Sequence, residues 1–274
     1  MAIIQLTDIH LDATYGGKFP TMVHLDKVIQ DIRKRRSEHL LREDAIIITG
    51  DICDGDDRYY YEMVFDMLHR AFPETPVFVT PGNHDDRDIL DEIVLREHDR
   101  SKRLGMDFES HGRILRPGAY GVTFDHNHHK VLILDTGHSA KDDTCEFLDT
   151  QKEYLSSTRH EYLVFSHMPV IPVPHRFMQQ DGFCMKQGES SSRIAELANA
   201  IFCGHYHFAN TLKAGDYALN GRRSRVDQYV CPAIQCQLDP YSPECSPSGV
   251  FPGYQVIHCS ITGEAPRVET RLLY

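Results

Sequence analysis

Five short apolar segments in this chain are each followed by aspartate, asparagine or histidine. Segments of this length, rich in β-branched residues, are typical of strands buried on both faces of a sheet. The segments are residues 2–7, 45–49, 77–80, 162–166 and 200–203, and the residues that follow them are Asp8 and His10, Asp51 and Asp54, Asn83 to Asp85, His167, and His205 and His207. In open α/β sheets, ligands bind in the crevice outside the carboxyl ends of the strands. The sequence therefore predicts that these distant side chains gather in one crevice.

The spacing of apolar residues predicts an α/β fold with two stacked sheets and helices outside them. Helical periodicity occurs in residues 24–32, 59–68 and 88–103, between and after the first three predicted strands. This β-α-β-α-β order is the pattern of parallel strands joined by helical crossovers. In the second half, residues 121–124 and 131–134 flank a polar, histidine-rich segment that we interpret as a solvated hairpin turn, and we predict antiparallel strands near 229–230, 254–259 and 268–272.

Composition excludes several classes of protein. The 274 residues are 41% hydrophobic and 25% charged, which is ordinary for one large globular domain or a domain with an insertion. The formal net charge is −11, whereas nucleic-acid-binding proteins usually carry an excess of basic residues. No apolar stretch has the length of a membrane span, and the first residues do not resemble a secretion signal. We therefore expect a cytoplasmic protein without membrane or nucleic-acid partners.

Eight cysteines occur without a recognisable signal peptide, so reduced thiols are expected in place of a disulfide framework. Cys231, Cys236 and Cys245 lie in a proline-rich stretch. We favour free thiols there and leave open a structural zinc site or an intersubunit disulfide.

The candidate ligands are carboxylates, imidazoles and an amide oxygen, with no thiolate. Such a set suits manganese, iron, zinc, cobalt or nickel better than the all-oxygen sites of calcium or magnesium. Asp51, in a tight Gly-Asp turn, can place one carboxylate oxygen on each of two ions. Two ions about 3.5–4 Å apart hold both the attacking and the leaving oxygen of an in-line displacement at phosphorus.

The motifs Asp8-x-His10, Gly50-Asp51-x-x-Asp54, Gly82-Asn83-His84-Asp85, His167 and Gly204-His205-x-His207 resemble those of the calcineurin-like binuclear metallophosphoesterases. In length and spacing the chain is similar to the class III branch, which contains cyclic nucleotide phosphodiesterases and glycerophosphodiesterases. The resemblance implies a four-layer α/β/β/α sandwich of two mixed β-sheets flanked by helices, with a small C-terminal cap. It also implies two transition-metal ions of the Fe, Mn, Zn or Co type.

The resemblance further implies a role for each motif residue. Asp8, His10, Asp51 and His207 would hold the first metal, and Asp51, Asn83, His167 and His205 the second. Asp51 and His84 would be the catalytic residues, with His84 beside the phosphate, where it stabilises the transition state or protonates the leaving alkoxide. We predict that Asp54, Asp85 and Asp135 orient ligands or loop amides. Many relatives carry a second histidine after the position of His167, where this chain has Met168.

We expect residues 1–215 to form the catalytic core, and residues 216–274 to supply a cap or dimerisation segment and the final strands of the core. The expected activity is hydrolysis of small phosphodiesters, either 3′,5′-cyclic nucleotides or glycerophosphodiesters, by in-line attack of a metal-bound hydroxide. A phosphomonoesterase or protein phosphatase on the same metals is the alternative. A non-catalytic scaffold is disfavoured because every ligand position is filled. A homo-oligomer through the C-terminal segment is left open.

Overall fold

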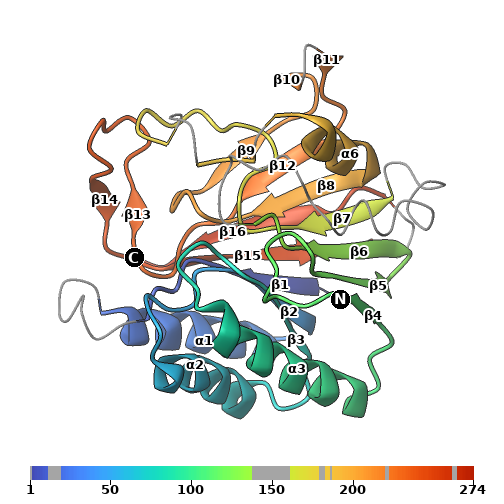
Figure 1. Cartoon of the computed structure of the whole chain (residues 1–274). Coiled ribbons are helices and arrows are strands. Elements are labelled where there is room, and N and C mark those ends of the chain that lie inside the picture. Colours follow the sequence, from blue (N-terminus) through green and yellow to red (C-terminus); the bar gives the residue numbers. More distant parts are fainter. Residues whose placement is uncertain are drawn as a thin grey trace.

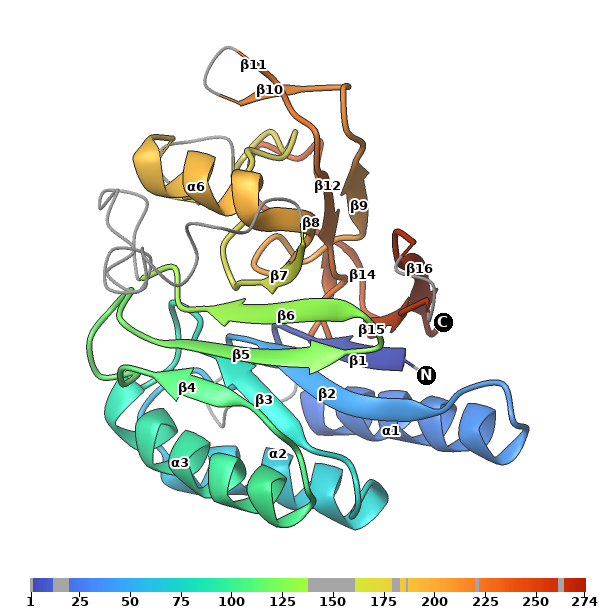
Figure 2. The same ribbon diagram turned by 90° about the vertical axis from the view of Figure 1, so that its right-hand side faces the viewer.

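Two mixed β-sheets stack face to face at the centre of the molecule, and helices cover both outer faces (Figures 1 and 2). The computed structural model describes residues 2–11, 20–137, 161–178, 183–185, 187–219, 222–260 and 264–274. The four-layer α/β/β/α arrangement predicted from the sequence is confirmed. Among the described residues, none of the helices combines the length and the apolar composition that crossing a membrane requires.

The first sheet has the strand order β16-β15-β1-β2-β3. Its strands are β1 (Ala2–Leu6), β2 (Glu43–Thr49), β3 (Val77–Thr80), β15 (Gly253–His258) and β16 (Arg267–Leu272). β1, β2 and β3 are parallel, whereas β15 pairs antiparallel with both β1 and β16. Helices α1 (Thr21–Ser37), α2 (Arg58–Ala71) and α3 (Arg87–Arg103) lie together on the outer face of this sheet (Figure 1).

The second sheet has the order β4-β5-β6-β7-β8-β12-β9. Its strands are β4 (Glu109–His111), β5 (Gly121–His126), β6 (His129–Leu134), β7 (Tyr162–Phe165), β8 (Ala198–Cys203), β9 (Asn210–Leu212) and β12 (Asp227–Val230). Helix α6 (Glu189–Leu197) lies on its outer face (Figure 2). Two small hairpins complete the described elements: β10 (Ala218–Leu219) with β11 (Arg222–Arg223), and β13 (Gln237–Leu238) with β14 (Pro247–Gly249).

Apolar packing and a few buried polar side chains join the two sheets. Phe78 of β3 stacks on Phe124 of β5 with ring centroids 4.9 Å apart. Gln5 of β1 donates to the carbonyl of Cys203 in β8, and Thr80 of β3 donates to the carbonyl of Leu134 in β6. Hydrogen bonds between buried polar groups are directional. They therefore set the register of one sheet on the other.

The five apolar segments are the buried strands β1, β2, β3, β7 and β8, as their composition predicts. The prediction of antiparallel pairing near residues 229–230 is wrong on one side. β12 pairs antiparallel with β9 but parallel with β8. The chain reaches this position through the edge strand β9, which reverses its direction, so that no helical crossover is needed.

The histidine-rich turn is also less solvated than predicted. His126 and His129 are 8% and 3% exposed, whereas His128 between them is exposed. Nε2 of His126 lies 3.6 Å from a carboxylate oxygen of Asp44 at the start of β2. The turn therefore packs against the first sheet, which the local sequence cannot reveal.

The C-terminal part contributes to both sheets, since β12 lies in the second sheet and β15 and β16 lie in the first. Within the predicted cap segment 216–274, residues 239–252 include β14 of the β13–β14 hairpin. The division of the chain after residue 215 stays a prediction. No disulfide joins any two of the seven described cysteines, which include Cys231, Cys236 and Cys245.

Candidate metal centre

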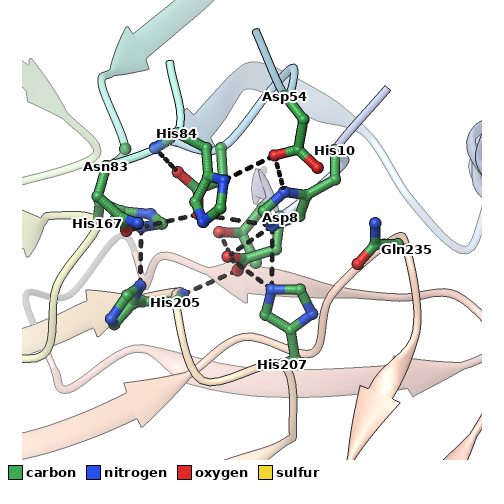
Figure 3. Close-up of polar contacts among 12 residues, drawn as sticks. Asp8, His10, Asp54, Asn83, His84, His167, His205, His207 and Gln235 are labelled. Atoms are coloured by element: carbon green, nitrogen blue, oxygen red, sulfur yellow. Dashed lines mark hydrogen bonds and ion pairs between the residues drawn. The ribbon is translucent and has the colours of Figure 1, made fainter. Parts of the chain in front are cut away.

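The seven predicted metal ligands lie together at one edge of the two sheets, although they follow strands of both (Figure 3). Each comes just after the carboxyl end of β1, β2, β3, β7 or β8. Since β1 to β3 are parallel to one another and β7 is parallel to β8, the loops after these strands meet at a common edge. The two-sheet architecture thus builds the site from five separate loops.

Asp8, His10 and His207 form the first group of donor atoms. Nε2 of His10 lies 3.1 Å from Nε2 of His207. Oδ1 of Asp8 lies 3.3 Å from Nε2 of His207 and 3.9 Å from Nε2 of His10. Two ring nitrogens and a carboxylate oxygen therefore face a common point.

Asn83, His167 and His205 form the second group. Nε2 of His167 lies 3.0 Å from Oδ1 of Asn83 and 3.1 Å from Nδ1 of His205. Asp51 stands between the groups, because its Oδ2 is 3.5 Å from Nε2 of His10 and 3.3 Å from Nε2 of His167. A single carboxylate oxygen thus faces both sets of donors.

In His10 and His167, the ring nitrogen that points away from the other donor atoms, Nδ1, is hydrogen-bonded to another part of the chain. Nδ1 of His10 lies 2.7 Å from Oδ1 of Asp54, and Nδ1 of His167 donates to the carbonyl oxygen of Thr49 at 2.8 Å. A proton on Nδ1 leaves the lone pair of the neutral imidazole on Nε2. Such a hydrogen bond fixes both the tautomer and the ring orientation of a metal-binding histidine.

The carboxylates are anchored in the same way. Oδ2 of Asp8 accepts hydrogen bonds from the hydroxyl of Thr7 and the amide of His205, both at 2.8 Å. Oδ1 of Asp51 accepts from the amide of His84 at 2.9 Å. One oxygen of each carboxylate is therefore engaged with the protein, and the other faces the site.

These residues fit two metal ions. Oδ1 of Asp8 is buried and has no hydrogen-bond partner among the described residues. An oxygen buried without a partner is costly unless a cation or donor satisfies it. The ring nitrogens of His10 and His207 lie 3.1 Å apart, as do those of His167 and His205, so each pair could face a common ion. The donor set of carboxylates, an amide oxygen and imidazoles suits manganese, iron, zinc or cobalt.

The electrostatics of the group keep its carboxylates ionised. Burial opposes the charge of Asp8, but His207 and His167 outweigh burial and hold the pKa of Asp8 at about 2. The pKa of Asp51 is likewise lowered: burial acts against its charge, and His167 and His10 outweigh burial. Burial also disfavours a charged His167, yet the neighbouring Asp51 raises the pKa of His167 to about 9. Asp8 and Asp51 therefore carry negative charges in a buried site, and these charges require cationic partners.

The backbone is strained at five of the candidate ligands. Positive φ angles occur at Asp8 (51°), His10 (48°), Asp51 (52°), His205 (70°) and His207 (52°). Residues with a Cβ avoid this region, and those that adopt it cluster at functional sites. Gly82 and Gly204 provide the necessary space, because a Cβ would lie 2.0 Å from Oδ1 of Asp51 at Gly82 and 1.9 Å from the hydroxyl of Thr7 at Gly204.

Asp85 organises the loop that carries Asp51. Its carboxylate accepts hydrogen bonds from the amides of Asp51 and Ile52 at 2.9 Å and of Gly82 at 2.8 Å. The hydroxyl of Tyr61 in α2 also donates to it, at 3.3 Å. Asp85 therefore orients loop amides, as predicted, and connects the loop after β2 to the loop after β3.

Replacing Asp85 with alanine would leave several buried amides without acceptors. We expect Asp85→Ala to lower the free energy of unfolding by about 2–4 kcal/mol. Displacement of Asp51 should also weaken metal binding by about 10–100-fold. Denaturant unfolding and metal titration would measure the two effects. Unchanged metal affinity in the folded variant would contradict this role.

His84 and Asp54 lie next to each other and next to His10 (Figure 3). Nδ1 of His84 is 2.8 Å from Oδ1 of Asp54, the same oxygen that lies beside Nδ1 of His10. The side chain of His84 is 46% exposed, in contrast to the buried His10. Burial opposes ionisation of Asp54, but the hydrogen bonds with His10 and His84 prevail and lower its pKa. Asp54 therefore positions one candidate ligand and one exposed histidine together.

Asp135 orients loop amides, as predicted, because it accepts from the amides of Gly118 and Gly137. It also forms a two-point ion pair with Arg87 at 2.6 and 3.0 Å at the start of α3. Gln235 was not predicted, yet its amide donates to the carbonyl of Asp8, and Figure 3 shows its side chain on the side of the site where His10 and His207 lie. No motif marks this glutamine, because it reaches the site from a loop between β12 and β13.

A protein-family model matches most of the chain. The model of the calcineurin-like phosphoesterase family matches residues 1–209. This range contains all seven candidate ligands together with Asp54, His84 and Asp85.

Three similar proteins align with most of the chain. A probable cyclic nucleotide phosphodiesterase of Pseudoalteromonas sp. strain SM9913 is 22% identical, covering 100% of this chain and 94% of that protein. A probable cyclic nucleotide phosphodiesterase of Psychrobacter arcticus is 23% identical, covering 98% of this chain and 93% of its own length. The glycerophosphodiester phosphodiesterase GpdQ of Enterobacter lignolyticus is 24% identical, and the alignment covers 76% of this chain and 71% of that protein.

Proposed function

Because the chain belongs to the calcineurin-like phosphoesterase family and is a hydrolytic phosphoesterase, we propose that it is a binuclear metal phosphodiesterase of small diesters. The observation that carries the proposal is the position of Asp51, whose Oδ2 faces both groups of donor atoms. Asp8, His10 and His207 would hold one ion with Asp51, and Asn83, His167 and His205 would hold the other. When bound, such a pair activates water and neutralises charge on phosphoryl oxygens.

His84 is the residue of this chain best placed to handle a proton of the substrate. Its Nδ1 is held by Asp54, so its Nε2 is the nitrogen left for the substrate. With its ring partly exposed, it stands at the rim where the ester groups of a bound diester would lie. Donation of a proton from Nε2 to the departing alkoxide would stabilise a leaving group that is otherwise poor.

Charge favours a diester over a monoester. A phosphate monoester carries nearly two negative charges near neutral pH, because its second pKa is about 6, whereas a diester carries one. Within the described part of the chain, the groups that do most to lower the pKa values of Asp8, Asp51 and Asp54 are histidines. No described lysine or arginine is among the main causes of these lowered pKa values, which agrees with a substrate that carries a single negative charge. The names of the three relatives, all phosphodiesterases, agree with this choice.

A substrate panel on metal-reconstituted protein tests the proposal. We would compare a 3′,5′-cyclic nucleotide, a glycerophosphodiester, bis(4-nitrophenyl) phosphate and 4-nitrophenyl phosphate, with manganese, iron, zinc or cobalt. We expect kcat/KM for at least one diester to exceed that for the monoester, and chelation to abolish both activities. A marked preference for the monoester would instead support a phosphomonoesterase, and no hydrolysis at all would support a scaffold.

A further inference from the structure

The loop of residues 234–238 lies against the first group of donor atoms. The amide of Ile234 donates to the carbonyl of Thr7 at 3.1 Å, and the amide of Gln235 donates to the carbonyl of Asp8 at 3.0 Å. At the other end of the loop, the amide of Leu238 donates to the carbonyl of His207 at 2.7 Å. The backbone of Gln235 is therefore tied to the same chain segments that present Asp8 and His207.

Helix α1 also secures this loop. Nδ1 of His24, a residue that is 5% exposed, lies 3.1 Å from the carbonyl oxygen of Ile234 and 2.9 Å from that of Gln235. Gln237 donates to the carbonyl oxygens of Ala233 and Phe251. These contacts hold the loop from both sides, so the side chain of Gln235 projects from a fixed backbone.

The amide group of Gln235 faces the site and keeps a free donor. Figure 3 shows the side-chain amide of Gln235 on the side of the site where His10 and His207 lie. The residue is only 6% exposed, and its Oε1 contacts the thiol of Cys236 at 3.9 Å. Among the described residues, Nε2 donates a hydrogen bond to none. Because no described residue accepts a hydrogen bond from Nε2, this donor is available to a ligand in the site.

We propose that Gln235 is a specificity-determining residue, whose Nε2 donates a hydrogen bond to a phosphoryl oxygen of the substrate on the side of Asp8 and His207. The inference rests on the function proposed above and names one further residue of the same site. A carboxamide binds an oxygen without adding charge. It therefore suits the single negative charge of a diester, whereas a lysine at this position would add attraction for a dianion.

The test uses three variants of the full chain. Gln235→Ala removes the donor, Gln235→Lys replaces it with a cation, and Gln30→Ala, on the exposed face of α1, is the control. The probes are bis(4-nitrophenyl) phosphate, 4-nitrophenyl phosphate and inorganic phosphate as an inhibitor. Metal content and Tm are measured for each variant, since a merely structural role would change these values.

For Gln235→Ala we expect KM for the diester and the inhibition constant of phosphate to rise about tenfold, the value of a hydrogen bond to a charged group. Turnover, metal content and Tm should stay close to those of the unmodified protein and of the control. For Gln235→Lys we expect the ratio of monoester to diester kcat/KM to rise about tenfold.

Two results would overturn the inference while leaving the proposed function intact. One is unchanged KM and phosphate inhibition in Gln235→Ala together with an unchanged substrate ratio in Gln235→Lys. The other is a loss of activity in Gln235→Ala that is accompanied by loss of metal or a lowered Tm, which would make the residue structural. Absence of hydrolysis by the unmodified protein would instead contradict the proposed function itself.

Discussion

Replacing Asp51 with asparagine is expected to release both metal ions and to lower kcat/KM for diesters by about a thousandfold or more, the equivalent of several kcal/mol of lost transition-state stabilisation. The reason is that Oδ2 of Asp51 faces both donor groups, 3.5 Å from Nε2 of His10 and 3.3 Å from Nε2 of His167. An amide in its place keeps the volume but removes the charge. Metal analysis of the purified variant and steady-state kinetics would measure the two losses together.

The matched control is Asp56→Asn, which removes an exposed carboxylate a few residues further along the same loop. It should retain both ions and normal activity, so a general effect of charge on the loop can be separated from the role of Asp51. Full activity and two bound ions in Asp51→Asn would show that the bridge lies elsewhere. Loss of only one ion would show that Asp51 serves one donor group.

Replacing His84 with alanine should leave the metal content intact and slow turnover of diesters with alkoxide leaving groups by about 10²–10⁴-fold. His84 faces Asp54 at 2.8 Å and is more exposed than the candidate ligands, so its loss leaves their contacts in place. For a nitrophenolate leaving group, which departs without a proton, the loss should shrink to less than about tenfold. Kinetics on a glycerophosphodiester and on bis(4-nitrophenyl) phosphate would compare the two cases.

The control for this experiment is His69→Ala, which removes a histidine that pairs with Glu97 on the helical face of the molecule, away from the site. It should change neither activity nor metal content. An equal loss for both leaving groups in His84→Ala would indicate that His84 binds the transition state without donating a proton. Loss of metal in His84→Ala would make the residue a ligand.

The convergence of the candidate ligands was predictable because each of them follows a segment with the composition of a buried strand. The runs before Asp8, Asp51 and His167 are short, β-branched and bounded by polar residues. Parallel strands place such residues at one edge, so the pattern predicts convergence before any contact is known. The resemblance implied the assignment of these ligands to two ions, and the side chains that it assigns to each ion lie together in the folded chain.

Features that depend on long-range packing could not be predicted from local pattern. The parallel pairing of β12 with β8 follows from the route through β9, which periodicity does not encode. The burial of His126 and His129 depends on Asp44, a residue of the other sheet. Composition alone describes a polar turn, because it carries no information about what packs against it.

The position of Gln235 at the site also could not be predicted from local sequence pattern. A glutamine in a proline-rich loop has no spacing or chemistry that distinguishes it from other surface amides. Its place beside the donor groups depends on the backbone bonds that tie the loop to Asp8 and His207. The strained φ angles at the ligands are likewise visible only in the folded chain. The sequence does show glycines next to these ligands, at Gly50, Gly82 and Gly204, where a Cβ would collide with neighbouring atoms.

Anomalous X-ray diffraction from crystals of the metal-reconstituted protein tests the two-ion centre most directly. The account predicts two anomalous peaks about 3.5–4 Å apart. One should lie among Asp8, His10 and His207, the other should lie among Asn83, His167 and His205, and Asp51 should touch both. A single peak, or peaks away from these side chains, would contradict it.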